Sequence, residues 1–279
     1  MTVDSKLYNN PSEDDIPFAE ALPLNDPRSG AGPKAYPIGL KNYHDDDIEA
    51  NVLQEATVLE NLGWDRETRK IFIRKVYSIL AFQLLLTFCV SAFMTLHTPT
   101  QVYVLTHGWP VMLSMVSSFI LIFALMCYKD KEPTNMYLLW TFTFAEAFLV
   151  GNVVTIYCNE GYQGIVLEAV FLTMAIFIGL TIFTFQAKID FSFLGAFLSM
   201  GLGALLLWGF LAMIFGVQTG YVYALLGCIL FSGYILFDTW LIMDKLSPHE
   251  YVLAAIMLYL DIINLFLYLL QLLSSNDRQ

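Results

Sequence analysis

Long apolar segments with few charges constrain this chain more than any other feature of its sequence. Seven such segments lie between residues 73 and 273, and each has at least 20 residues. A helix needs about 20 apolar residues to cross a hydrocarbon core about 30 Å thick, because each residue adds about 1.5 Å. We therefore predict seven transmembrane helices. They are expected at 73–96, 109–128, 137–158, 164–185, 191–214, 220–243 and 250–273.

The composition indicates a membrane protein rather than a soluble one. Hydrophobic residues make up 57% of the chain and charged residues 14%, against roughly 45–50% and about 25% in soluble proteins. The connections between the segments are short, so neighbouring helices should run antiparallel. The predicted fold class is an all-α membrane protein, a seven-transmembrane-helix bundle over residues 65–274, followed by a short tail at 275–279.

The first 64 residues differ in character from the rest of the chain. They hold twelve acidic and four basic residues, and so contribute −8 to the net charge of −11. With six prolines and little apolar surface to offset the entropic cost of ordering, residues 1–64 are expected to form a disordered, acidic, cytosolic tail. One short amphipathic helix is expected within it, at about 48–62. The acidity belongs to the tail and does not indicate a cation site in the membrane.

The positions of Lys and Arg predict the orientation of the helices. Cytosolic connections are enriched in these residues. Here they precede the first segment and return in every second connection, whereas the connections on the opposite side have none. The N-terminus is therefore expected in the cytosol and the C-terminus on the other side, which argues against a rhodopsin-like receptor. The residues are Arg66, Arg69, Lys70, Arg74, Lys75, Lys129, Lys131, Lys188 and Lys245.

Asp261 lies near the middle of the seventh segment. Asn264, Tyr268 and Gln271 follow at offsets of 3, 7 and 10 residues, so all four lie on one face of a helix that is otherwise apolar. An ionised carboxylate in a span costs several kcal/mol unless it is paired, hydrated or protonated. The stripe is therefore expected to face the bundle interior, with either a functional role or a role in tying helices together by hydrogen bonds.

Asp238 lies toward the cytosolic end of the sixth segment, and a helix-end carboxylate reaching water is the alternative to a functional role. Ser247, Pro248 and Glu250 have the spacing of a capping box at the start of the next helix. The sixth and seventh helices should therefore form a tight antiparallel hairpin. Counting from the turn, however, leaves a depth difference of roughly 10 Å between Asp238 and Asp261, so the sequence does not establish that they meet.

Glu146 lies at the centre of the third segment, without Lys or Arg at its depth. It must be protonated, hydrated or hydrogen-bonded. A functional and a structural role are equally open for this residue.

Several stretches together resemble the transmembrane Bax-inhibitor-motif family, in its Lifeguard branch. The resemblance runs from about residue 66 to the C-terminus, and Leu258–Phe266 is its most specific part. The stretches are Phe72–Tyr77, Phe142–Glu146, Gly179–Phe185 with Asp190 and Phe191, Phe237–Ile242, and Leu258–Phe266.

The resemblance implies seven helices with the seventh at the centre of the other six. It also implies a pH-sensitive calcium leak through an intracellular membrane such as the endoplasmic reticulum, Golgi or vacuole, with roles in calcium homeostasis and protection from stress-induced cell death. By motif match, the pH-sensing pair is Asp238 and Asp261. Some bacterial members carry a basic residue in the second span that locks this pair, and segment 109–128 has none.

Physical chemistry gives such a pair a mechanism. Two adjacent carboxyl groups in a low-dielectric site cannot both ionise easily, so their protons leave in coupled steps. A shared proton would hold the two helices together, whereas two charges would repel each other and attract Ca²⁺. Ca²⁺ prefers six to eight oxygens, so Asp238 and Asp261 could bind it only weakly and transiently, with help from Asn264, water or backbone carbonyls.

Other classes of function stay open. A non-conducting membrane regulator would bind channels or death-pathway proteins. An intramembrane aspartyl protease would have Tyr-Asp on one helix and Gly-x-Gly-Asp on the next, whereas this chain has Phe237-Asp238 and Leu260-Asp261. We therefore expect no enzymatic activity and no cofactor other than calcium as a permeant ion. The expected partners are the lipid bilayer, calcium and membrane proteins, and not nucleic acid.

Overall fold

The computed structural model describes residues 66–277 apart from Asp130, Lys188 and Gln218. The tail expected to be disordered and the helix expected at 48–62 therefore lie outside the described residues. Within the described part, the secondary structure is helical and contains no strand. The elements are α2 (Arg66–Leu96), α3 (Thr98–Thr106), α4 (Trp109–Tyr128), α5 (Thr134–Asn159), α6 (Gln163–Gln186), α7 (Ser192–Phe215), α8 (Tyr221–Asp244), η2 (Pro248–Glu250) and α9 (Tyr251–Asp277).

Seven of the described helices are long and apolar enough to cross a membrane, which confirms the predicted fold class. Their bounds agree with the predicted segments to within a few residues, except that α2 begins at Arg66 rather than at 73. α9 also continues to Asp277. The nine-residue α3 was not predicted. It is too short to span a bilayer and lies between α2 and α4.

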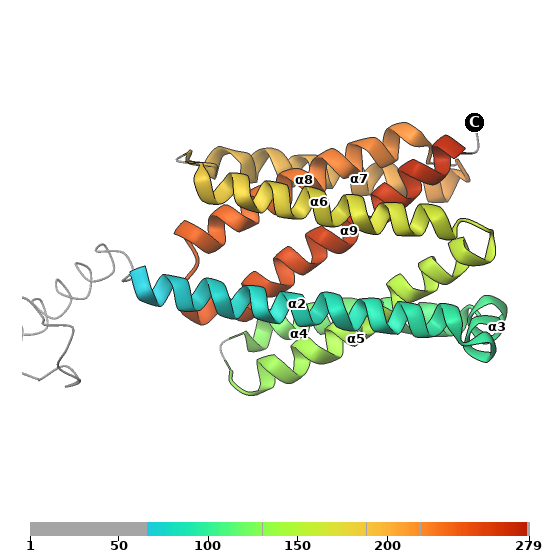
Figure 1. Cartoon of the computed structure of the whole chain (residues 1–279), viewed down its shortest axis with the longest axis horizontal. Helices are drawn as coiled ribbons and strands as arrows, with labels where there is room; N and C mark the ends of the chain where they lie inside the picture. The colour runs from blue at the N-terminus through green and yellow to red at the C-terminus, as the bar shows by residue number, and fades with distance from the viewer. Residues whose placement is uncertain (1–65, 130, 188, 218, 278–279) are drawn as a thin grey trace, which may run out of the picture. The chain divides into compact units, whose positions relative to one another are not determined.

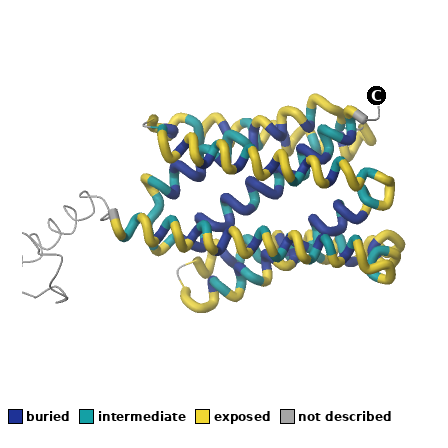
Figure 2. The backbone as a smooth tube through the Cα atoms, viewed as in Figure 1, coloured by how far each residue is buried: buried dark blue, intermediate teal, exposed yellow. Residues whose placement is uncertain are grey.

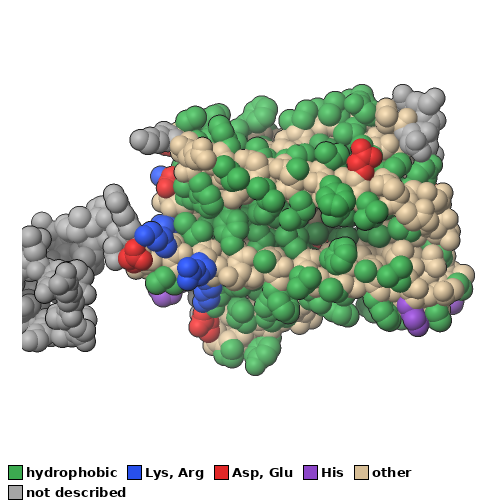
Figure 3. Space-filling view, in the orientation of Figure 1, with side chains coloured by type: hydrophobic (Ala, Val, Ile, Leu, Met, Phe, Trp, Pro, Cys, Tyr) green, Lys and Arg blue, Asp and Glu red, His purple; other side chains and the backbone are tan. Residues whose placement is uncertain are grey.

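The long helices alternate in direction, so the bundle has two distinct ends (Figure 1). We call them the η2 end, with the start of α2 and η2, and the α3 end, with α3 and the end of α9. Every described Lys and Arg lies in the first turns of α2 or in the connections at the η2 end, where blue side chains gather in Figure 3.

α9 is the central helix of the bundle, as the resemblance implied. It packs against α2, α5, α6 and α8. In its most apolar stretch 67% of the residues are buried, against 11% in α4 and 17% in α7. Figure 2 shows buried backbone along much of α9. The apolar side chains that α4 and α7 expose are the surface expected to face lipid.

Candidate functional site

The capping box predicted at the start of the seventh helix is present. The Ser247 backbone N–H donates to Glu250 Oε2 at 3.0 Å, and the His249 backbone N–H donates to Ser247 Oγ at 3.4 Å. The first turn differs from the prediction in one respect, because Pro248–Glu250 forms a 3₁₀ turn and the α-helix begins at Tyr251. The short turn brings α8 and α9 together as the most extensive helix pair in the bundle.

The two aspartates meet across this pair. Asp238 is 4% exposed and Asp261 6% exposed, and their side chains lie close enough to interact directly. A hydrogen bond between two carboxyl groups requires that one of them is protonated, because a carboxylate can only accept. We call Asp238 and Asp261 the aspartate pair.

The helix ends explain how the expected depth difference is closed. Asp238 lies six residues before the last residue of α8, and Asp261 lies ten residues after the first residue of α9. The four-residue difference corresponds to only about 6 Å, rather than the roughly 10 Å obtained by counting from the turn. Figure 1 shows that α9 runs obliquely through the bundle relative to α2 and α6. This inclination and the length of two facing side chains are sufficient to bridge the remaining difference in depth.

None of the described Lys, Arg or His residues forms an ion pair with Asp238 or Asp261. Within the described residues the one ion pair is that of Lys70 with Glu67, 2.8 Å apart on the surface. Tyr234 lies one turn before Asp238 on α8, close to both carboxyl groups. The Oδ2 atom of Asp261 has no hydrogen-bond partner among the described residues. The pair is therefore buried and has no ion-pair partner in the part of the chain that the structure describes.

The polar stripe that follows Asp261 faces α8, as an interior stripe should. The Tyr268 ring packs against Gly227, and its hydroxyl lies 3.3 Å from that of Tyr223. Gln271 Nε2 donates to the backbone oxygen and to Oγ1 of Thr219, both at 3.0 Å. Asn264 differs, because its Nδ2 donates to the Leu260 carbonyl of its own helix at 2.8 Å. Its side-chain oxygen stays available for another partner.

Glu146 does not join the aspartate pair. It lies on α5, half-buried, beside the hydroxyl of Ser118 on α4 and near Tyr259 on α9. The structure therefore separates the predicted polar residues into two places.

A second buried polar cluster links α2, α5 and α9. The positions of the charged residues in the sequence do not reveal it, because its members are uncharged. Gln83 Nε2 donates to Thr143 Oγ1 at 2.9 Å, and the hydroxyls of Thr87 and Tyr259 are 2.8 Å apart. Both bonds are buried. The available signal was Gln83 itself, an uncharged polar residue in a long apolar segment, because such residues commonly make bonds between helices.

The η2 end beside the aspartate pair is held by cationic side chains. The Arg69 guanidinium donates to the carbonyls of Ile242 and Leu246, at 3.1 and 2.6 Å. Lys75 Nζ lies 3.1 Å from the ring centroid of Tyr251, whose hydroxyl donates to Glu132. These contacts fix the end of α8 and the start of α9 against α2.

Calcium would find few ligands at the aspartate pair. Among the described residues no group of three or more His, Cys, Asp or Glu side chains could hold a metal ion. Two carboxylates with Asn264 as the nearest polar neighbour on α9 make a sparse oxygen site.

Comparisons with known proteins agree on one kind of relative. A family model described as inhibitor of apoptosis-promoting Bax1 matches residues 69–278. The chain is 44% identical to mouse protein lifeguard 4 over 212 residues, which covers 76% of this chain and 87% of the relative. It is 44% identical to the Golgi anti-apoptotic protein of vaccinia virus (strain Lister) over 214 residues, 76% and 88% of the two chains. Arabidopsis thaliana protein LIFEGUARD 3 is 38% identical over 245 residues, 85% and 97% of the two chains.

Proposed function

Because the chain belongs to the Bax inhibitor family, in its Lifeguard branch, we propose that it forms a pH-sensitive calcium leak in an intracellular membrane. The leak would contribute to calcium homeostasis and to protection from stress-induced cell death. The names of several relatives describe anti-apoptotic or Bax-inhibiting proteins. We propose the same class of cellular role for this chain.

The observation that carries the proposal is the aspartate pair. Two carboxyl groups face each other between α8 and α9, they are buried, and no described cation neutralises them. Ionisable residues inside a membrane bundle are costly and commonly mark an ion or proton pathway. A purely structural tie between two helices could use neutral amides or hydroxyls at lower cost.

The sign of the pH dependence follows from the charge on the pair. In acid, at least one carboxyl group is protonated, and the shared proton holds α8 against α9 in the closed state. As the pH rises, both carboxylates ionise and repel each other, which loosens the helix pair and offers oxygens to Ca²⁺. Among the described residues, Tyr234 is a titratable group that lies close to both carboxyl groups. Calcium flux should therefore increase with pH.

Calcium flux in reconstituted vesicles tests the proposal. The double variant Asp238→Asn, Asp261→Asn cannot ionise, so its flux should be low and independent of pH, whereas the unmodified chain should leak more at higher pH. Glu168→Gln is the matched control, because it also neutralises a carboxylate but at an exposed position on α6. If the double variant retains both the flux and its pH dependence, the aspartate pair is not the sensor.

A non-conducting regulator is the second candidate, and the names of two relatives favour it because they state an anti-apoptotic or a Bax-inhibiting role. The same double variant separates the two functions in cells. Under the leak proposal, loss of flux removes protection from stress-induced death. Full protection by a variant without flux would assign the role to binding of membrane-protein partners.

The membrane and orientation belong to the same proposal. Because cytosolic connections are enriched in Lys and Arg, the cations at the η2 end support the proposal that this end and the N-terminus are cytosolic. The aspartate pair would then sense pH from the cytosolic half of the bilayer. We propose the Golgi or another endomembrane as the location, in line with the name of the viral relative.

A further inference from the structure

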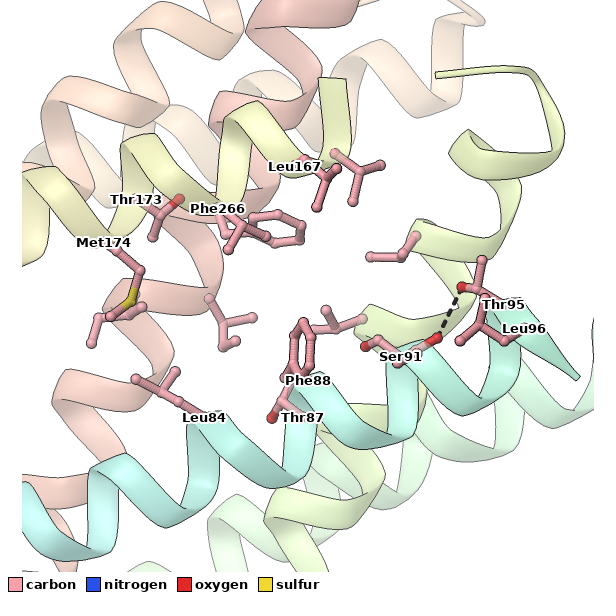
Figure 4. Close-up of a pocket in the computed structure, with 17 residues that line it drawn as sticks. Leu84, Thr87, Phe88, Ser91, Thr95, Leu96, Leu167, Thr173, Met174 and Phe266 are labelled. Atoms are coloured by element: carbon pink, nitrogen blue, oxygen red, sulfur yellow. Dashed lines mark hydrogen bonds between the residues drawn. The ribbon is translucent and has the colours of Figure 1, made fainter. Parts of the chain in front are cut away.

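A cavity of about 490 Å³ lies between α2, α5, α6 and α9, in the half of the bundle nearer the α3 end. Thr87 of the polar cluster forms part of its wall, and Ile262 and Ile263 in its wall directly follow Asp261, which itself does not line it. Figure 4 shows side chains of α2 and α6 extending toward this space from opposite sides. We call it the lateral cavity.

The lateral cavity arises because α2 and α6 meet only toward the η2 end. There the ring of Tyr77 packs against those of Phe177 and Phe185, with centroids 6.3 and 6.1 Å apart. Farther along α2, the residues from Leu84 to Leu96 border the cavity instead of packing on α6. Figure 3 shows the surface hollowed between these two helices.

The chemistry of the wall excludes a polar occupant. Apart from four hydroxyl residues the lining side chains are apolar. The hydroxyls of Thr87, Thr95 and Thr173 already donate to carbonyls of their own helices, at 2.9, 2.9 and 2.7 Å. Of the four lining hydroxyls, that of the buried Ser91 has no hydrogen-bond partner among the described residues. A trapped water needs two to four polar partners, so the cavity suits an apolar ligand.

The lateral cavity is continuous with the surface that faces lipid. Phe88 and Leu167 on its rim are 60% and 58% exposed, and both lie in helices that can span the membrane. Along α2 the lining runs from Leu84 to Leu96, twelve residues or about 18 Å. This length is close to half of a hydrocarbon core about 30 Å thick. The cavity is therefore as long as one leaflet is deep, and its long axis follows the helices.

We propose that the lateral cavity binds one acyl chain of a phospholipid from the leaflet at the α3 end. The acyl chain would enter between α2 and α6 and lie against Val150 and Ile262, which are 4% and 2% exposed. The volume of the lateral cavity lies within the range of roughly 300–1,000 Å³ that is typical of ligand pockets. The site goes beyond the calcium leak and does not depend on it, because it requires only the membrane-spanning bundle.

Photolabelling of the full chain tests the site. The protein is reconstituted in phosphatidylcholine vesicles that contain a phosphatidylcholine with a diazirine in its acyl chain, and labelled residues are mapped by mass spectrometry. We expect labels on Val150, Thr173 and Ile262, which form the floor of the cavity and which lipid outside the bundle does not reach. Labels confined to exposed residues such as Phe171 would overturn the proposal.

Filling the cavity supplies the matched comparison. Ala92→Phe places a ring in the cavity from α2, whereas Ala175→Phe makes the same change at an exposed position of α6 outside the lining. Floor labelling should be lost in Ala92→Phe and retained in Ala175→Phe. Val170→Phe fills the cavity from α6 and replaces Ala92→Phe if that variant does not fold.

Two further results would also contradict the proposal. Floor labelling that persists in the folded cavity-filling variants would place the lipid elsewhere. Floor labelling by a photoactivatable sterol or a free fatty acid, but not by the phospholipid, would assign the cavity to a different apolar ligand.

Discussion

Single hydroxyl groups hold the central helix at positions that its apolar pattern does not reveal. Tyr259 is fully buried in the middle of the bundle, and its hydroxyl lies 2.8 Å from the hydroxyl of Thr87. A buried hydroxyl left without a partner costs about 1–3 kcal/mol. The contact between α2 and α9 therefore depends on a chemical match as well as on shape.

Thr87→Val tests this match, because valine keeps the shape and removes the hydroxyl. We expect destabilisation by about 1–3 kcal/mol, since the phenol of Tyr259 loses its partner. The measurement is the midpoint of thermal unfolding in detergent. Thr141→Val is the control, because the Thr141 hydroxyl is exposed and bonds only to Tyr137 of its own helix. Equal midpoints for the two variants would show that the buried bond contributes nothing.

Gly227 allows α8 and α9 to approach each other closely. A Cβ atom at this position would lie 2.3 to 2.5 Å from the ring of Tyr268, well inside contact distance. We expect Gly227→Ala to destabilise the protein by about 1–3 kcal/mol through overpacking. Gly203→Ala on α7 has nothing within 4 Å of its Cβ, so it should be neutral or stabilising by up to about 1 kcal/mol. If Gly227→Ala and Gly203→Ala had the same unfolding midpoint, this result would contradict the close approach of α8 and α9.

At the scale of the elements, the α8–α9 pair is tied to α2 at the η2 end. The carbonyls at the end of α8 lack partners within their own helix, as at every helix C-terminus. Arg69 supplies donors to two carbonyls of this region, those of Ile242 and Leu246. A residue before the predicted first segment thus contributes to the position of the sixth and seventh spans.

Replacing Arg69 with methionine removes these donors but keeps a long side chain. We expect a loss of about 1–2 kcal/mol, reduced by the half-exposed position of Arg69, together with faster hydrogen exchange of the amides around Leu246. Arg74→Met is the matched control, because Arg74 is exposed on the same helix. Faster exchange in both variants would show that the charge of α2 matters and the two bonds do not.

At the scale of the whole molecule, the charged side chains separate the two ends of the bundle. A single cysteine in place of Lys131 should react with an impermeant thiol reagent from the cytosolic side. A cysteine in place of His107 at the α3 end should react from the other side. The experiment uses a chain in which Cys89, Cys127, Cys158 and Cys228 are replaced. Labelling of both positions from the same side would overturn the orientation.

The sequence by itself determined the seven spans, their alternation, the cationic end and the capped turn between the last two helices. These features depend on local quantities, namely the length of an apolar run, the charge of a connection and the spacing of Ser247 and Glu250. The central place of α9 came from family resemblance, since the polar stripe indicates only that one face of that helix is buried.

Only the tertiary structure decided that Asp238 meets Asp261, that Glu146 lies elsewhere, and that Gln83 and Thr87 bond across the bundle. It also decided that α2 and α6 separate to leave the lateral cavity. The physical reason is that these contacts join residues far apart in the chain. Helix inclination and close packing set their distances over a few ångströms, and a pattern within one helix does not encode either.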